Sequence, residues 1–257
     1  MHEDYASAHF NKGIAHNTLS ETLEAIQSFT KSLDLNPNDD RVRYLLGGTL
    51  LSHAKSLLNS NYVEAEEYLL RAMNHIEDSI ENIDAKNPRA LHLRCEIGNA
   101  LQYDDMENLC YCNAALDANR EEASTHIDED VTLNLLGIIS KQMLEYNDAI
   151  KYFSQGLKVN SESYEILINM ASVYSDTGNY ELANTYFKQA EALDIADPFL
   201  RAYLLANKGW LMEKQELRLA ARQLYTQAIS LSQPNPHPQI ITNLSNIDRY
   251  CEINPCE

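Results

Sequence analysis

The chain has 257 residues, 44% of them apolar, which is enough for one folded domain or a long array of repeats. Its formal net charge of −18 argues against nucleic acids and anionic membranes as partners. Its eight glycines form neither a GxGxxG nor a GxxxxGK[ST] phosphate loop, and no apolar run is long enough to span a membrane. These features leave proteins and peptides as partners, and they indicate no cofactor.

The cysteines and the first residues predict a cytoplasmic protein. Five cysteines, odd in number and unevenly spaced, are typical of free thiols in a reducing compartment. The segment 1–5 has neither the basic nor the apolar region of a signal peptide. No metal site is expected at Cys110 and Cys112, because they point to different faces of a helix.

Taken in order, the chain begins with a predicted helix–turn–helix segment over residues 6–39. Its first helix carries the small residue Gly13, and its second carries Ala25 and Phe29. Small residues let two helices approach closely, and a large ring fills the remaining space.

The second predicted segment, residues 40–88, is longer than the first. Its Gly47 and Ala65 are 18 residues apart, against 12 for the corresponding pair of the first segment. Helical spacing continues through the extra length, so both helices are expected to be extended, the second by two to three turns. The extension is either a docking feature or a peculiarity of this chain. An exposed apolar patch there would favour self-association through residues Ile76, Ile80 and Ile83.

The third segment, residues 89–120, follows the pattern less closely. Gly98 fits the small position, and Cys112 takes the position that a large ring occupies elsewhere. The stretch 121–130 has five carboxylates in ten residues, which predicts a solvated linker.

The fourth and fifth segments, residues 130–163 and 164–198, repeat the same pattern at an offset of 34 residues. The offset joins three pairs of positions: Tyr146 and Tyr180, Ala149 and Ala183, and Phe153 and Phe187. A sixth segment follows over residues 201–234. The last predicted helix, residues 238–251, has one apolar stripe and one polar face, as expected of a terminal cap.

This period and this arrangement of small and large residues resemble the tetratricopeptide repeat. The resemblance covers nearly the whole chain and is strongest in the first, fourth, fifth and sixth segments. It implies an all-α, right-handed superhelical solenoid of about six repeats with a C-terminal capping helix. The alternative for the last helix is the first half of a further repeat. The resemblance also implies that His9 and His16, at positions the family usually fills with Trp and Tyr, are packed core residues rather than metal ligands.

The resemblance also implies a binding surface, since the first helices of such repeats line a concave groove that holds an extended peptide or a helix. The positions expected to face this groove are Asn11, Tyr44, Asn99, Asn134, Lys141, Asn169, Tyr203 and Asn207. A carboxamide can hold a peptide backbone through its donor and acceptor atoms. We therefore hypothesise a ladder of Asn134, Asn169 and Asn207, the alternative being ordinary polar residues on a wetted face.

One specific family function is not expected. Members that bind the C-terminal tails of chaperones hold a carboxylate with paired cations. The matching positions here are Phe10, Ile14, Asn134 and Ile138 for the first pair, and Tyr203 and Asn207 for the basic pair. Only Asn169 matches, at the middle position, so the cations that charge-assisted binding requires are missing.

No HExxH or GxSxG motif is present, and no nucleophile has an identifiable base, so the chain is not expected to be an enzyme. The sequence favours a non-enzymatic scaffold that binds a partner's peptide or helix in its groove. The alternative is a regulatory or chaperone-like receptor that sequesters a peptide or a basic client protein.

Overall fold

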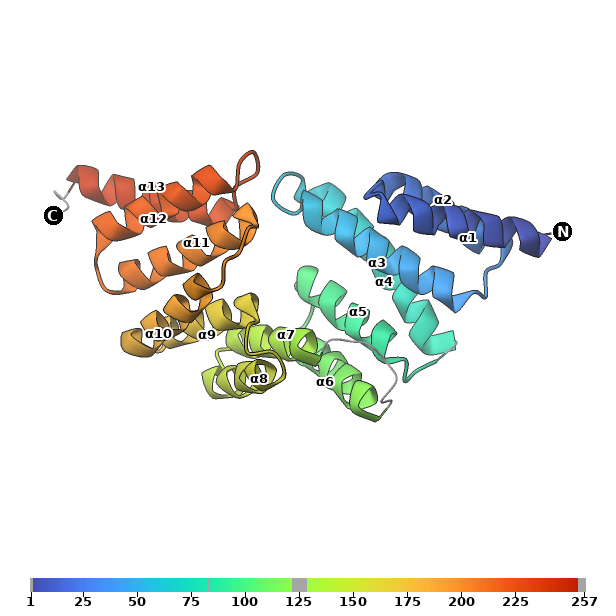
Figure 1. Cartoon of the computed structure of the whole chain (residues 1–257), viewed down its shortest axis with the longest axis horizontal. Coiled ribbons are helices and arrows are strands. Elements are labelled where there is room, and N and C mark those ends of the chain that lie inside the picture. The colour runs from blue at the N-terminus through green and yellow to red at the C-terminus, as the bar shows by residue number, and fades with distance from the viewer. Residues whose placement is uncertain (1, 83, 122–128, 254–257) are drawn as a thin grey trace. The chain divides into compact units, whose positions relative to one another are not determined.

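The computed structural model describes residues 2–82, 84–121 and 129–253, and this part of the chain is all-α. It contains thirteen helices, packed in sequential antiparallel pairs (Figure 1). The predicted all-α class and the succession of helix pairs are confirmed. The right-handed superhelical path and the division into repeats stay predictions.

The chain forms two compact units, residues 1–135 and 136–257. The helices of the first are α1 (His2–Thr18), α2 (Thr22–Leu35), α3 (Asp40–Leu57), α4 (Tyr62–Asn82), α5 (Pro88–Ala100) and α6 (Asp105–Glu121). The boundary falls within α7 (Glu129–Gln142). The second unit continues with α8 (Tyr146–Val159), α9 (Tyr164–Asp176), α10 (Tyr180–Ala192), α11 (Pro198–Lys214), α12 (Arg218–Leu231) and α13 (Pro238–Ile253).

Close contact between a small residue and a ring holds the helix pairs together. A Cβ atom added to Gly137 would lie 2.4 Å from Phe153 Cε1, inside van der Waals contact. The first and sixth pairs repeat the arrangement, with Gly13 against the ring of Phe29 and Gly209 against that of Tyr225. The alanines of the second helices are fully buried beside these rings: Ala25, Ala149, Ala183 and Ala221. The predicted packing of small against large residues is confirmed.

The second helix pair keeps this contact but shifts it along α4. Gly47 meets Ile76, which lies 14 residues after the start of α4. In α2, α8, α10 and α12 the corresponding ring lies seven residues after the start of the helix: Phe29, Phe153, Phe187 and Tyr225. The predicted extension of α4 is therefore confirmed, since it has 21 residues against 14 in α2, and the extra two turns lie at its turn end.

The apolar patch considered for self-association is not exposed at the residues that the structure describes. Ile76 is fully buried, and Ile80 packs against the same core. Ile76 faces Gly47 of α3. Ile83 lies outside the described residues.

The third pair, α5 and α6, replaces the usual contact with polar groups. Its first helix ends sooner after the small residue, so Gly98 precedes the start of α6 by seven residues whereas Gly137 precedes the start of α8 by nine. With this shift, Asn108 takes the alanine position and Cys112 the ring position. The buried Arg94 guanidinium fills the space: it lies 2.7 Å from a Glu107 carboxylate oxygen and 4.4 Å from the centre of the Tyr111 ring.

A disulfide joins Cys95 in α5 to Cys112 in α6, with a Cα–Cα distance of 5.2 Å. The prediction that all five cysteines are free thiols is therefore wrong. Residues 17 positions apart meet here because α5 and α6 fold back on each other. Cys251 is also disulfide-bonded, and Cys110 is a free, exposed cysteine.

Most of the predicted acidic linker, residues 122–128, lies outside the described residues. Its ends belong to helices, with Glu121 closing α6 and Glu129 and Asp130 opening α7. His9 and His16 are half-buried rather than enclosed in the core, and His16 Nδ1 lies 2.6 Å from a Glu21 carboxylate oxygen. The prediction that both are packed core histidines is therefore wrong.

The C-terminal helix α13 packs its apolar stripe on α12. Ile247 is buried against Ala221 and Tyr225, with Ile240 and Leu244 partly buried beside them. Among the described residues, no cluster of His, Cys, Asp or Glu could hold a metal ion. No helix in this part of the chain has the length and apolar character needed to cross a membrane.

Gly137→Ala should destabilise the protein by about 1–3 kcal/mol, because the buried Phe153 ring has no room to move away from a new methyl group. Gly48→Ala is the matched control, since its Cβ would meet nothing closer than 3.9 Å. That change should stabilise α3 by up to about 1 kcal/mol through helix propensity. Urea unfolding measures both, and equal effects would contradict the packing account.

Replacing the disulfide with alanines, C95A/C112A, should lower the free energy of unfolding by about 3 kcal/mol. The reason is that the bond joins two residues 17 positions apart and so restricts the conformations of the unfolded chain. C110A, at the exposed neighbouring cysteine, should change stability by less than about 0.5 kcal/mol. Non-reducing peptide mapping should recover residues 95 and 112 in one linked species. Recovery of two separate peptides would contradict the assignment.

Candidate partner-binding face of the second unit

The first helices of the second unit bring together four of the residues predicted to bind a partner. Lys141 lies in α7, Asn169 in α9, and Tyr203 and Asn207 in α11. The other predicted residues belong to the first unit: Asn11, Tyr44, Asn99 and Asn134. Of the three asparagines in the hypothesised ladder, only Asn169 and Asn207 therefore lie in the second unit.

Asp176, at the end of α9, links α7 to α11. Lys141 Nζ lies 3.3 Å from one of its carboxylate oxygens and donates a hydrogen bond of 2.6 Å to Ser172 Oγ. Trp210 Nε1 donates to the other carboxylate oxygen at 2.8 Å. The ammonium of Lys214 lies 4.5 Å from the centre of the Trp210 ring, within the range of a cation–π interaction. The half-buried Asp176 carboxylate thus joins the first helices of three consecutive pairs, α7, α9 and α11.

A second link joins α9 to α11 one helical turn or more away. The Tyr203 hydroxyl donates to Asn169 Oδ1 at 2.7 Å, and Asn207 Nδ2 donates to the Tyr203 backbone oxygen at 2.9 Å. Burial of the hydroxyl end raises the pKa of Tyr203 to about 12, although 41% of the whole residue is exposed. The hydroxyl is therefore a protonated donor at neutral pH. Asn169 itself is buried, so its acceptor oxygen serves the fold.

Three aromatic residues follow one face of α11 at helical spacing. Phe199, Tyr203 and Trp210 are separated by four and seven residues, which places their side chains on a single stripe. Phe199 is 55% exposed, and Trp210 is half-buried above Asp176. Amphipathic aromatic rings of this kind are enriched at the energetically dominant positions of protein interfaces.

The predicted binding residues of the first unit differ in how far they are exposed to solvent. Asn11 is exposed on α1, whereas Tyr44, Asn99 and Asn134 are half-buried on α3, α5 and α7. Burial is the main reason that the pKa of the Tyr44 hydroxyl is raised.

Side-chain links also join the first helices of this unit, and sequence reasoning missed them. Lys55 pairs with Glu96, and His92 Nδ1 lies 3.0 Å from Thr132 Oγ1. Burial lowers the pKa of His92, which keeps its ring neutral. No sequence motif marks these residues. In the second unit, the single tryptophan of the chain, Trp210, was the available signal.

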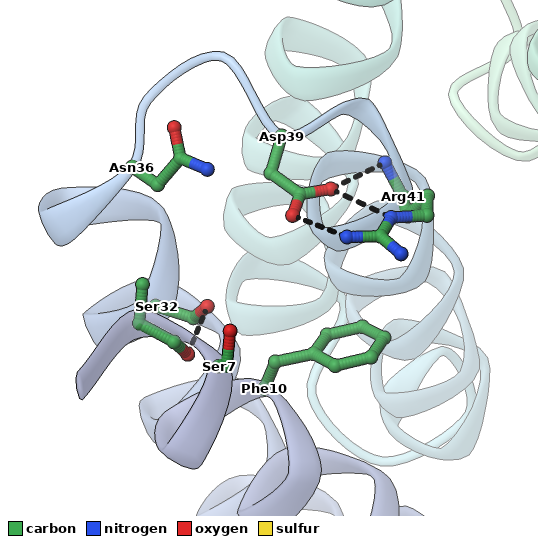
Figure 2. A pocket seen from close by; sticks show the side chains of 7 residues that line it. Ser7, Phe10, Ser32, Asn36, Asp39 and Arg41 are labelled. Carbon is green, nitrogen blue, oxygen red and sulfur yellow. Dashed lines mark hydrogen bonds and ion pairs between the residues drawn. The ribbon is translucent and has the colours of Figure 1, made fainter. Parts of the chain in front are cut away.

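Figure 2 shows a small hollow of about 160 Å³ where α1 and α2 meet the start of α3. Its one cation, Arg41, lies 5.6 Å from the centre of the Phe10 ring and is paired with Asp39 at 2.9 Å. The hydrogen bonds from Arg41 are the largest cause of the lowered pKa of Asp39. No lysine is among the residues that line this hollow.

Comparisons with known proteins place the fold. A family model described as tetratricopeptide repeat matches residues 6–39 and 164–194. Pseudomonas aeruginosa pilF is similar in structure at 16% identity and a TM-score of 0.61, over 97% of this chain and 99% of that one. A tetratricopeptide repeat protein of Parabacteroides merdae is similar at 16% identity and a TM-score of 0.62, over 95% and 99%.

A monomeric mutant of IFIT1 with Gppp-AAAA is similar over 90% of this chain and 50% of that chain, at 14% identity and a TM-score of 0.68. No curated protein matches the chain by sequence. At these identities the structural likeness shows the fold alone, a solenoid of paired helices, as the sequence predicted. The two matched segments are tetratricopeptide repeats, and they lie within this solenoid of paired helices.

Proposed function

We propose that the protein is a non-enzymatic interaction scaffold, and that the face formed by the first helices of the second unit binds an extended peptide or a helix of a partner. Tetratricopeptide repeats generally mediate protein–protein interactions. The observation that carries this proposal is the stripe of Phe199, Tyr203 and Trp210 on α11, which leaves large rings exposed to solvent.

The links beneath this face support the proposal, because they hold it in one shape before a partner arrives. Asp176 fixes α7 against α11, and Asn169 fixes the hydroxyl of Tyr203. A preformed surface loses less conformational entropy on binding than a mobile one. The Asn207 carboxamide lies beside the aromatic stripe, where it can hydrogen-bond to a peptide backbone.

The charge of the chain supports a peptide ligand over a nucleic acid, since a net charge of −18 repels phosphates. It equally supports the alternative function, a receptor that sequesters a basic client. A cytoplasmic location remains a proposal without support from the cysteines, because disulfides such as Cys95–Cys112 persist mainly in oxidising compartments.

A library of displayed 12-residue peptides, selected on the intact protein, supplies a ligand whose affinity fluorescence anisotropy can measure. F199A/N207A should weaken binding by at least about tenfold, since it removes an exposed ring and the nearest carboxamide. N169A is a poorer test, because it also breaks the bond to Tyr203.

L182A is the matched control, because Leu182 is an exposed apolar residue on the second helix of its pair. It should change affinity by less than about twofold. Equal losses in L182A and F199A/N207A would contradict binding on α11, and so would selected peptides that bind F199A/N207A as tightly as the unchanged protein.

A further inference from the structure

The helices α3 and α4 are longer at their turn end than the helices of the other pairs. Past its small residue Gly47, α3 continues for ten residues, whereas α7 and α11 continue for five past theirs. On the other side of the turn, α4 has 14 residues before Ile76, which contacts Gly47. The helices α2, α8 and α12 have seven residues before the ring that contacts their glycine. At the α-helical rise this adds about 7 to 10 Å. We call residues 52–70 the α3–α4 tip.

The tip is a rigid element rather than a loose loop. Ala54, Ala65 and Leu69 are fully buried between its two helices. The rings of His53 and Tyr68 meet edge to face with centres 4.5 Å apart. Asn61 caps α4, accepting from the Glu64 backbone N–H and donating to the Glu64 carboxylate.

The outer side of the tip nevertheless exposes large apolar residues. Val63 is 76% exposed, Leu70 43% and Tyr62 45%. Val63 and Leu70 are seven residues apart, so they lie on the same face of α4, as the contact residues of paired helices do. A solvated helix face would carry polar residues at these positions.

The charges beside this face are mainly negative, with Arg71, next to Leu70, lying over the Tyr68 ring at 5.3 Å from its centre. Glu66 and Glu67 are exposed between Val63 and Leu70, and Lys55 on α3 is already paired with Glu96. Residues 1–135 contain 24 Asp and Glu against 10 Lys and Arg, a net charge of −14, whereas residues 136–257 contain 14 against 10, a net charge of −4. The acidity of the chain is thus concentrated in the unit that carries the tip.

From this geometry and charge we infer that the α3–α4 tip docks a lysine- or arginine-rich amphipathic helix of a partner protein. The apolar side of that helix covers Val63 and Leu70, and its cations lie against Glu66 and Glu67. Charge complementarity selects this occupant over a second copy of the chain, because the α3–α4 tip of another copy would bring like charges together. The inference does not depend on the proposed function of the second unit.

The test uses the full chain and a fluorescent 18-residue peptide of leucine and lysine with its leucines on one helical face. V63S/L70S and E66K/E67K should each weaken binding by at least about tenfold, and a leucine–glutamate peptide of the same pattern should not bind. Every substituted side chain is exposed, so the variants should fold, which circular dichroism checks.

E181K and L182S are the matched controls, because both residues are exposed near the start of α10 in the second unit. Each should change peptide affinity by less than about twofold. Losses as large in these controls as in the α3–α4 tip variants would overturn the inference by making the binding a general effect of charge. A dimer in sedimentation that V63S/L70S converts to a monomer would also overturn it, since the occupant would then be a second copy.

Discussion

The structure depends on one contact that recurs between the two helices of a pair: a small residue in the first helix against a large side chain in the second. Gly137 and Phe153 approach so closely that a single methyl group would overlap the ring. This distance sets how far apart the helix axes lie, and through that which side chains of the first helices face outward. The side-chain contacts that join α7, α9 and α11 depend on this spacing.

The α5–α6 pair shows what the chain uses where that contact is missing. Asn108 and Cys112 replace the alanine and the ring, and a buried arginine and a disulfide occupy the vacated space. Arg94 is tolerated there because Glu107 neutralises it and Tyr111 covers its face. Such a polar interior is stabilised by specific partners rather than by apolar area, so it accepts fewer substitutions than the Phe153 pair.

The sequence was sufficient to predict the helix pairs, because their small and large residues recur within one period and depend on local spacing. It misplaced the contact in α4, where Ala65 and Ala72 both fit the alanine position. Seven residues make two helical turns and return to the same face, so periodicity alone cannot separate the two registers. Only the packing of Gly47 on Ile76 decides between them.

The candidate site was predicted less well than the fold, because a residue's partners lie on other helices. Asn169 was expected to face a ligand, yet its oxygen accepts from Tyr203, 34 residues away. The net charge of the whole chain did not locate a site, since most of it belongs to the first unit and the aromatic stripe lies in the second. Exposed rings on α11 and exposed carboxylates on α4 call for different chemistry in what they bind. The two proposals therefore assign partners of different chemistry to different surfaces of the chain.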